Sequence, residues 1–96
     1  MMSKSLILHL VLKHKYYDAI DRGDKLIEYR DNTPFWRKRI TPKWNSNGGN
    51  IVVLLRGYTK TIMVFFIKNL VFNGEQIEIH LGERLKPSRG VLEKNE

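Results

Sequence analysis

The residues best suited to chemistry lie in one short segment, where Gly23, Lys25, Glu28 and Arg30 follow one another. Glycine tolerates the positive φ of a tight reversal, so Gly23 predicts a turn from which the chain enters a strand. In an extended strand Glu28 and Arg30 share one face and can form an ion pair. Lys25 reaches Glu28 only if residue 25 still belongs to the turn, because a regular strand from that position directs it to the opposite face.

Two interpretations of this charged group stay open. It can be an ion-paired plug at one end of a small barrel, because buried charges are normally paired. Alternatively, a lysine at the mouth of a barrel can bind phosphate or polarise a carbonyl group. Lys25 and Glu28 are therefore the candidate catalytic residues if the protein is an enzyme.

The four residues form the motif G-x-K-x-x-E-x-R, and through it the sequence resembles the ASCH family, a branch of the PUA-like β-barrels. The flanking order is similar to that of small phage and bacterial members, with Tyr29-Arg30, Phe35-Trp36 and Lys38-Arg39 in succession. The resemblance covers most of residues 6–81. It implies a PUA-like barrel whose cleft holds the motif residues and binds RNA, a nucleotide or a modified nucleoside.

Aromatic and basic residues alternate between positions 29 and 44. Rings stack on unpaired bases and cations contact phosphates, so this composition is typical of proteins that bind single-stranded nucleic acid. In the competing interpretation Phe35 and Trp36 cap the core, and Trp44 is either exposed or folded back onto the barrel. The candidate residues for binding RNA or a nucleotide are Gly23, Lys25, Glu28, Arg30, Trp36, Lys38, Arg39, Lys43 and Trp44.

A hydrolase is the main alternative to a binding module. Some ASCH relatives resemble amidohydrolases that deacylate N4-acylcytidine with a lysine, a threonine and a glutamate, and others are reported as ribonucleases. Lys25 matches the lysine, but Glu28 replaces the threonine and removes the hydroxyl of an acyl-enzyme route. Glu28 would then activate water while Lys25 neutralises the oxyanion. Glu75 and Glu78 are the only candidates for the remote glutamate, and a protein-interaction module of phage or mobile-element origin is a third possibility.

Hydrophobic periodicity predicts the elements that must position these residues. Alternating leucines predict a strand over 6–12, and its second face is also mostly apolar, so we expect it to be central or covered on both sides. Helical spacing predicts a helix over His14–Arg22 with Tyr16, Ala19 and Ile20 facing inward. Thr33-Pro34 has the composition of a helix start.

Four further strands are expected, over 25–30, 51–55, 61–72 and 76–81, with a bend at 68–69, a hairpin at Asn73-Gly74 and a flexible loop over 43–50. Mostly hairpin connections favour closure of the sheet. We expect an α+β, mainly β fold: a small PUA-like, partly closed β-barrel with one or two short helices. The helix over His14–Arg22 would close one end of it.

Composition limits the remaining possibilities. The chain has 96 residues, no cysteine and a formal net charge of +7. This excludes disulfides, cysteine-based zinc sites and thiol catalysis, and the basic balance favours a polyanionic partner. The spacing of His9, His14 and His80 predicts no metal site, and no cofactor motif is found. We expect a cytoplasmic monomer with no membrane partner, built as one domain over 1–85 and a polar tail over 86–96.

Overall fold

The computed structural model describes residues 7–44 and 50–86. Most of the expected flexible loop and nearly all of the expected tail therefore lie outside the described residues. Among the described residues, no helix is both long enough and apolar enough to span a membrane.

Five strands form a single sheet in the order β1-β3-β4-β5-β2. All five predicted strands are confirmed, although their bounds differ by a few residues. β1 pairs with β3 in parallel, and the other neighbouring pairs are antiparallel. In chain order the elements are β1 (Ile7–Leu12), α1 (His14–Asp21), β2 (Ile27–Asp31), α2 (Pro34–Ile40), the 3-10 helix η1 (Thr41–Lys43), β3 (Ile51–Arg56), β4 (Ile62–Phe72) and β5 (Gln76–Leu85).

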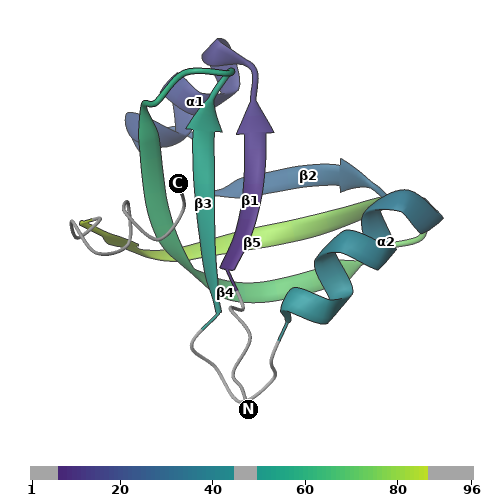
Figure 1. Ribbon diagram of the computed structural model, residues 1–96. Helices are drawn as coiled ribbons and strands as arrows, with labels where there is room; N and C mark the ends of the chain where they lie inside the picture. The colour runs from purple at the N-terminus through teal and green to yellow at the C-terminus, as the bar shows by residue number, and fades with distance from the viewer. Residues whose placement is uncertain (1–6, 45–49, 87–96) are drawn as a thin grey trace.

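The sheet curls into a half-barrel because β4 bends along its length. Its pairing with β5 shifts register between Phe65 and Ile67 and again between Ile67 and Asn69. The second shift falls on the predicted bend, and extra residues of this kind increase local twist and curvature. One half of β4 consequently runs beside the upright β3, while its other half runs beside β5 (Figure 1). This confirms the expected mainly β, partly closed architecture.

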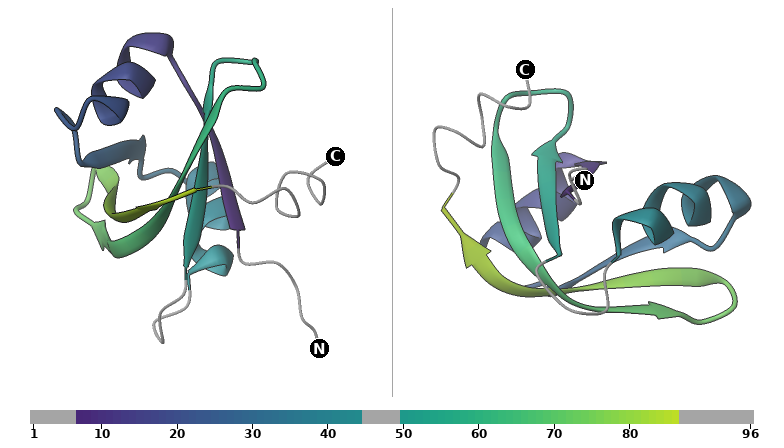
Figure 2. Two further views of the ribbon diagram at one scale, coloured as in Figure 1. Left: turned by 90° about the vertical axis from the view of Figure 1, so that its left-hand side faces the viewer. Right: turned by 60° about the horizontal axis from the view of Figure 1, so that its bottom comes forward.

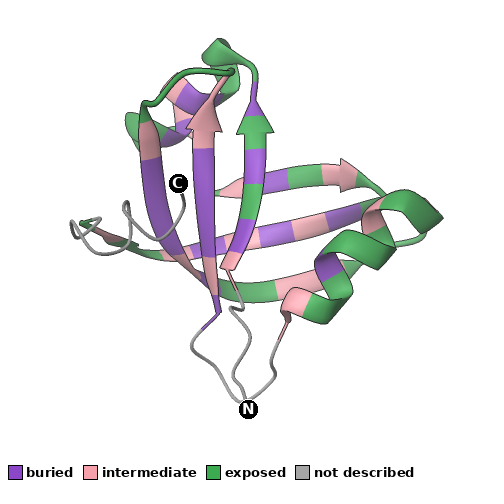
Figure 3. Cartoon of the chain, in the orientation of Figure 1, coloured by how far each residue is buried: buried purple, intermediate pink, exposed green. Residues whose placement is uncertain are grey.

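The core fills the concave side of this curled sheet. On β1 the side chains of Leu8, Leu10 and Leu12 are buried, as their alternation predicts. The expectation that β1 is central or covered on both faces is wrong. β1 is an edge strand whose His9 and Val11 are exposed, which gives it the alternating colours of Figure 3.

Helix α1 lies at the end of the half-barrel where β1 terminates, and its Tyr17 and Ile20 join the core (Figures 1 and 2). Tyr16 was expected to face inward, but it is largely exposed. The buried side of the helix instead contains Tyr17 and Ile20, so Tyr17 takes the inward place expected for Tyr16. Ion pairs from Asp18 to Arg56 and from Asp21 to Arg84 fasten the outer side of α1 to the sheet.

Helix α2 starts as the sequence predicts. The Thr33 hydroxyl oxygen accepts a hydrogen bond from the amide of Trp36 at 3.3 Å, and Pro34 occupies the first turn. Ile40 is buried in the core, and Trp36 packs against it from the same helix. The cap therefore fixes where α2 begins and which side of Trp36 faces the sheet.

Candidate functional site

The turn after α1 determines where Lys25 lies. Gly23 has a φ of 85°, and the amides of Gly23 and Asp24 donate to the carbonyls of Ile20 and Ala19 in a Schellman motif. The Lys25 amide also donates to the Ala19 carbonyl, at 3.2 Å. Since β2 begins only at Ile27, Lys25 still belongs to the turn. Of the two arrangements left open by the sequence, this is the one in which Lys25 reaches Glu28.

The buried carboxylate of Glu28 forms ion pairs with two cations, Lys25 and Arg30. Its Oε1 lies 3.1 Å from the Lys25 ammonium and its Oε2 lies 2.9 Å from Arg30 Nη2. The Glu28 side chain is 8% exposed, against 23% for Lys25 and 16% for Arg30. The carboxylate is thus the inner member of the cluster, and the two cations lie between it and solvent.

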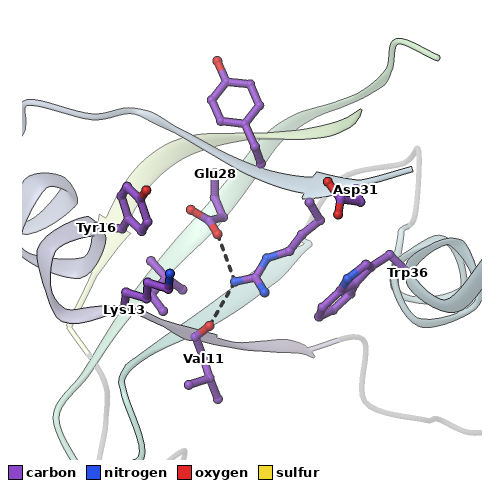
Figure 4. A pocket seen from close by; sticks show the side chains of 9 residues that line it. Val11, Lys13, Tyr16, Glu28, Asp31 and Trp36 are labelled. Carbon is purple, nitrogen blue, oxygen red and sulfur yellow. Dashed lines mark hydrogen bonds and ion pairs between the residues drawn. The ribbon is translucent and has the colours of Figure 1, made fainter. Parts of the chain in front are cut away.

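Arg30 joins three elements that are far apart in the sequence. From β2, its Nη2 donates to the carbonyl oxygen of Val11 on β1 at 3.1 Å. Its guanidinium lies over the Trp36 ring of α2, 4.8 Å from the centroid. Figure 4 shows the two dashed contacts of this guanidinium, to Glu28 and to Val11. Arg30 therefore bridges β1 and β2, the two edge strands of the half-barrel.

A pocket of about 470 Å³ opens beside this bridge. Tyr16 and Trp36 stand at opposite sides of it, with Glu28 between them (Figure 4). Asp31 adds an exposed carboxylate to its wall. The complete lining is Val11, Leu12, Lys13, Tyr16, Glu28, Tyr29, Arg30, Asp31 and Trp36.

The Arg30 guanidinium keeps one unused donor. Its Nε is buried and has no hydrogen-bond partner in the described part of the chain. Buried donors are almost always paired, so this unpaired nitrogen at the wall of a pocket is an exception that an acceptor from outside the protein would satisfy. With Lys13 on the same lining, the chemistry of the pocket suits an anionic group next to a flat ring.

The candidate binding residues divide into two sets. Gly23 shapes the turn, and Lys25, Glu28, Arg30 and Trp36 form one connected set of contacts, although Lys25 is not among the residues that line the pocket. The others lie elsewhere: Arg39 stacks on exposed Phe35 at 4.3 Å, Lys38 lines a hollow on another side of α2, Lys43 belongs to η1, and Trp44 packs against the core. Of the alternatives for Trp44, the one in which it folds back onto the barrel is therefore observed.

Six of the nine lining residues were not among the candidate binding residues, namely Val11, Leu12, Lys13, Tyr16, Tyr29 and Asp31. Val11 contributes a backbone carbonyl, which carries no sequence signal. Lys13 and Tyr16 do carry one, because the run from Lys13 to Tyr17 mixes basic and aromatic residues as positions 29–44 do. The sequence alone does not show that residues 13–17 and residues 29–44 contribute to the same pocket.

The candidate remote glutamates do not reach the cluster. Glu78 is paired with Tyr29 across β2 and β5, whereas Glu28 is paired with Ile79, so Glu78 and Glu28 lie on opposite faces of the sheet. Glu78 instead binds His80 at 2.9 Å, and this hydrogen bond is the main cause that lowers the pKa of the Glu78 carboxyl. Glu75 lies in the exposed turn before β5.

No protein-family model matches the sequence, and a search of curated proteins finds no match. Within residues 7–44 and 50–86, no group of three or more His, Asp or Glu side chains could hold a metal ion.

Proposed function

We propose that this chain is an ASCH-like module that binds a nucleotide, free or within single-stranded RNA, in the pocket between β1 and β2. The observation that carries the proposal is Arg30, fixed by Glu28, the Val11 carbonyl and Trp36 at the wall of a pocket with aromatic sides. A guanidinium held in this way presents charge to a phosphate without losing further side-chain freedom.

The aromatic walls supply the second half of nucleotide recognition. Tyr16 and Tyr29 are 42% and 41% exposed, and their rings flank the Lys25 ammonium at 5.4 Å each. Exposed rings beside fixed cations are the combination with which proteins stack bases and bind phosphates. The Asp31 carboxylate can accept hydrogen bonds from the amino group of a base.

The same geometry favours binding over hydrolysis. Both Glu28 oxygens already bind cations, so a water activated by this carboxylate would compete with Lys25 and Arg30 for the same lone pairs. The nearest threonine in sequence, Thr33, accepts a hydrogen bond from the Trp36 amide as a helix cap. These contacts support a cluster that positions its cations, with catalysis by Lys25 and Glu28 as the alternative to be measured.

An NMR titration with AMP, CMP, GMP and UMP tests the proposal. The two tryptophans give one indole signal in the pocket, from Trp36, and one outside it, from Trp44. We expect at least one nucleotide to shift the Trp36 indole and the Val11 amide while leaving the Trp44 indole unchanged.

A matched pair of variants completes this test. Arg30→Gln removes the guanidinium and should weaken binding about tenfold or more, the value of one charge-assisted hydrogen bond. Arg22→Gln removes an exposed arginine that pairs with Asp24 and should leave binding unchanged. The proposal is wrong if no nucleotide at millimolar concentration shifts the Trp36 indole, or if the two variants bind equally well.

A further inference from the structure

A second pocket, of about 480 Å³, lies on the other side of Arg30. Four separate segments build it: the end of β1, Arg30 of β2, the exposed side of α2 and the turn between β3 and β4. Its lining is His9, Val11, Leu12, Lys13, Arg30, Phe35, Trp36, Arg39, Gly57 and Tyr58.

The two pockets form one groove. Both are lined by Val11, Leu12, Lys13, Arg30 and Trp36. Arg30 and Lys13 are the cations of this shared wall, so positive charge lies at the middle of the groove. The aromatic residues found in only one pocket lie to either side, with Tyr16 and Tyr29 in the first and Phe35 and Tyr58 in the second.

Two aromatic side chains of the second pocket are exposed to solvent. Tyr58 is 95% exposed and Phe35 is 54% exposed. Arg39 is exposed as well, and its guanidinium lies 4.3 Å from the centroid of the Phe35 ring. Aromatic rings and guanidinium planes are the two surfaces on which proteins stack unpaired bases.

We infer that the groove binds two consecutive nucleotides of single-stranded nucleic acid, with the linking phosphate at Arg30 and Lys13. One base occupies the pocket between Tyr16 and Trp36, and the next stacks on Tyr58 and Phe35. This inference rests on the proposed function and narrows it, since the ligand becomes an oligonucleotide. A free mononucleotide would leave one aromatic end of the groove unused.

The affinities of ApA and AMP test the inference, because charge and stacking predict opposite orders of affinity. AMP carries the greater negative charge, so binding by charge alone favours AMP. A second stacked base contributes about 1–3 kcal/mol, so two occupied pockets make ApA bind about tenfold tighter at the same salt concentration. The affinity of the deoxy dinucleotide d(ApA), measured in parallel, shows whether RNA or DNA is the preferred ligand.

Tyr58 provides the decisive variant because its exposed ring contributes little to the core. Tyr58→Ala should reduce ApA affinity to the level of AMP and leave AMP affinity unchanged, while Tyr58→Phe should keep the affinity for ApA. Phe72→Ala, at a 43% exposed position outside both pockets, is the matched control and should change neither affinity.

The outcomes separate this inference from the proposed function. If AMP binds but ApA binds no tighter, or if Tyr58→Ala leaves ApA affinity unchanged, the two-nucleotide groove is wrong and the nucleotide pocket stands. If neither ligand shifts the NMR signal of the Trp36 indole, both proposals are wrong. Tyr58-dependent binding of a polyglutamate peptide in place of ApA would identify the groove as a protein-binding surface and overturn the inference.

Discussion

Of the two cations that pair with Glu28, Arg30 is the less exposed, and it connects β2 to both β1 and α2. Its single Nη2 atom contacts both Glu28 and the Val11 carbonyl, and its plane covers Trp36. A lysine can replace the charge but cannot stack a planar group on Trp36 while making both polar contacts.

We expect Arg30→Lys to lower the free energy of unfolding by about 2 kcal/mol, because the buried Glu28 carboxylate then has a less well matched partner. Lys25→Arg is the matched control. Lys25 is more exposed, so this change should stay within about 0.5 kcal/mol. Urea unfolding measures both, and equal midpoints for the two variants would contradict this account of Arg30.

Hydrolysis of N4-acetylcytidine is expected to be weak or absent. The acyl-enzyme route needs a hydroxyl or thiol beside a base, and position 28 supplies a carboxylate whose two oxygens are occupied. Chromatography of released cytidine measures the rate. Turnover of about one per second or faster that is lost in Lys25→Ala would establish the hydrolase. Turnover that survives Lys25→Ala would indicate a contaminant or another site.

At the scale of elements, the turn between β3 and β4 connects the groove to α1. Gly57 has a φ of 61°, donates to the Leu12 carbonyl at 2.8 Å, and lies so close to His14 that an added Cβ would be 2.7 Å from its Nε2. This close approach brings the tip of the turn, with Tyr58, to the end of β1.

Gly57→Ala should destabilise the protein by about 2 kcal/mol, from left-handed backbone strain plus displacement of the His14 ring. Gly74→Ala isolates the strain, because Gly74 has a φ of 93° and open space around it. We expect the larger loss at Gly57 and partial recovery when His14→Ala is added. Equal losses at the two glycines, measured by thermal unfolding, would show that the contact with His14 contributes nothing.

The bidentate pair of Asp18 with Arg56 fixes α1 on β3 at 2.9 and 3.0 Å. The hydrogen bond from Arg56 holds the pKa of the Asp18 carboxyl below its ordinary value. A carboxyl whose pKa falls on folding stabilises the folded state above its unfolded pKa of about 3.9, and this contribution is lost as the pH falls further.

We therefore expect Asp18→Asn to destabilise the protein at pH 7 but to make little difference near pH 2. Urea midpoints of the two proteins, measured across this range, should converge below about pH 4. A difference that stays constant across the range would contradict the role of this ion pair.

The secondary-structure elements could be predicted from the sequence, but the contacts between elements that are distant in sequence could not. Alternation predicts β1 and β5, runs of apolar or strand-forming residues predict the other three strands, and Asn73-Gly74 marks the β4–β5 hairpin. The polar residues after Leu81 suggest that the last strand ends there. β5 nevertheless continues to Leu85, because Arg84 and Leu85 pair with the bent β4.

The site was predicted only in the part that is local in sequence. The cluster of Lys25, Glu28 and Arg30 follows from turn geometry and a two-residue strand period. Its partners Val11 and Tyr16 depend on the parallel pairing of β1 with β3, which leaves β1 and β2 as the two edges of one curled sheet. Parallel pairing joins strands that are distant in sequence and leaves no short-range signal.

At the scale of the whole molecule, the half-barrel leaves a seam between its two edge strands, and the groove follows this seam. Unpaired strand edges invite unwanted pairing, and here a bridge from Arg30 to the Val11 carbonyl spans them. The net charge of +7 and the cations Lys13, Arg30 and Arg39 along this seam are the features on which the proposed binding of a polyanion rests.

The most direct test of the central claim is the salt dependence of binding to a fluorescently labelled single-stranded RNA, measured by anisotropy for the wild type, Arg30→Gln and Arg22→Gln. Each neutralised phosphate contributes about 0.7 to the slope of log affinity against log salt. The account predicts binding at low salt, a slope that falls by about 0.7 in Arg30→Gln, and an unchanged slope in Arg22→Gln. Absence of binding at low salt, or the same slope in both variants, would contradict it.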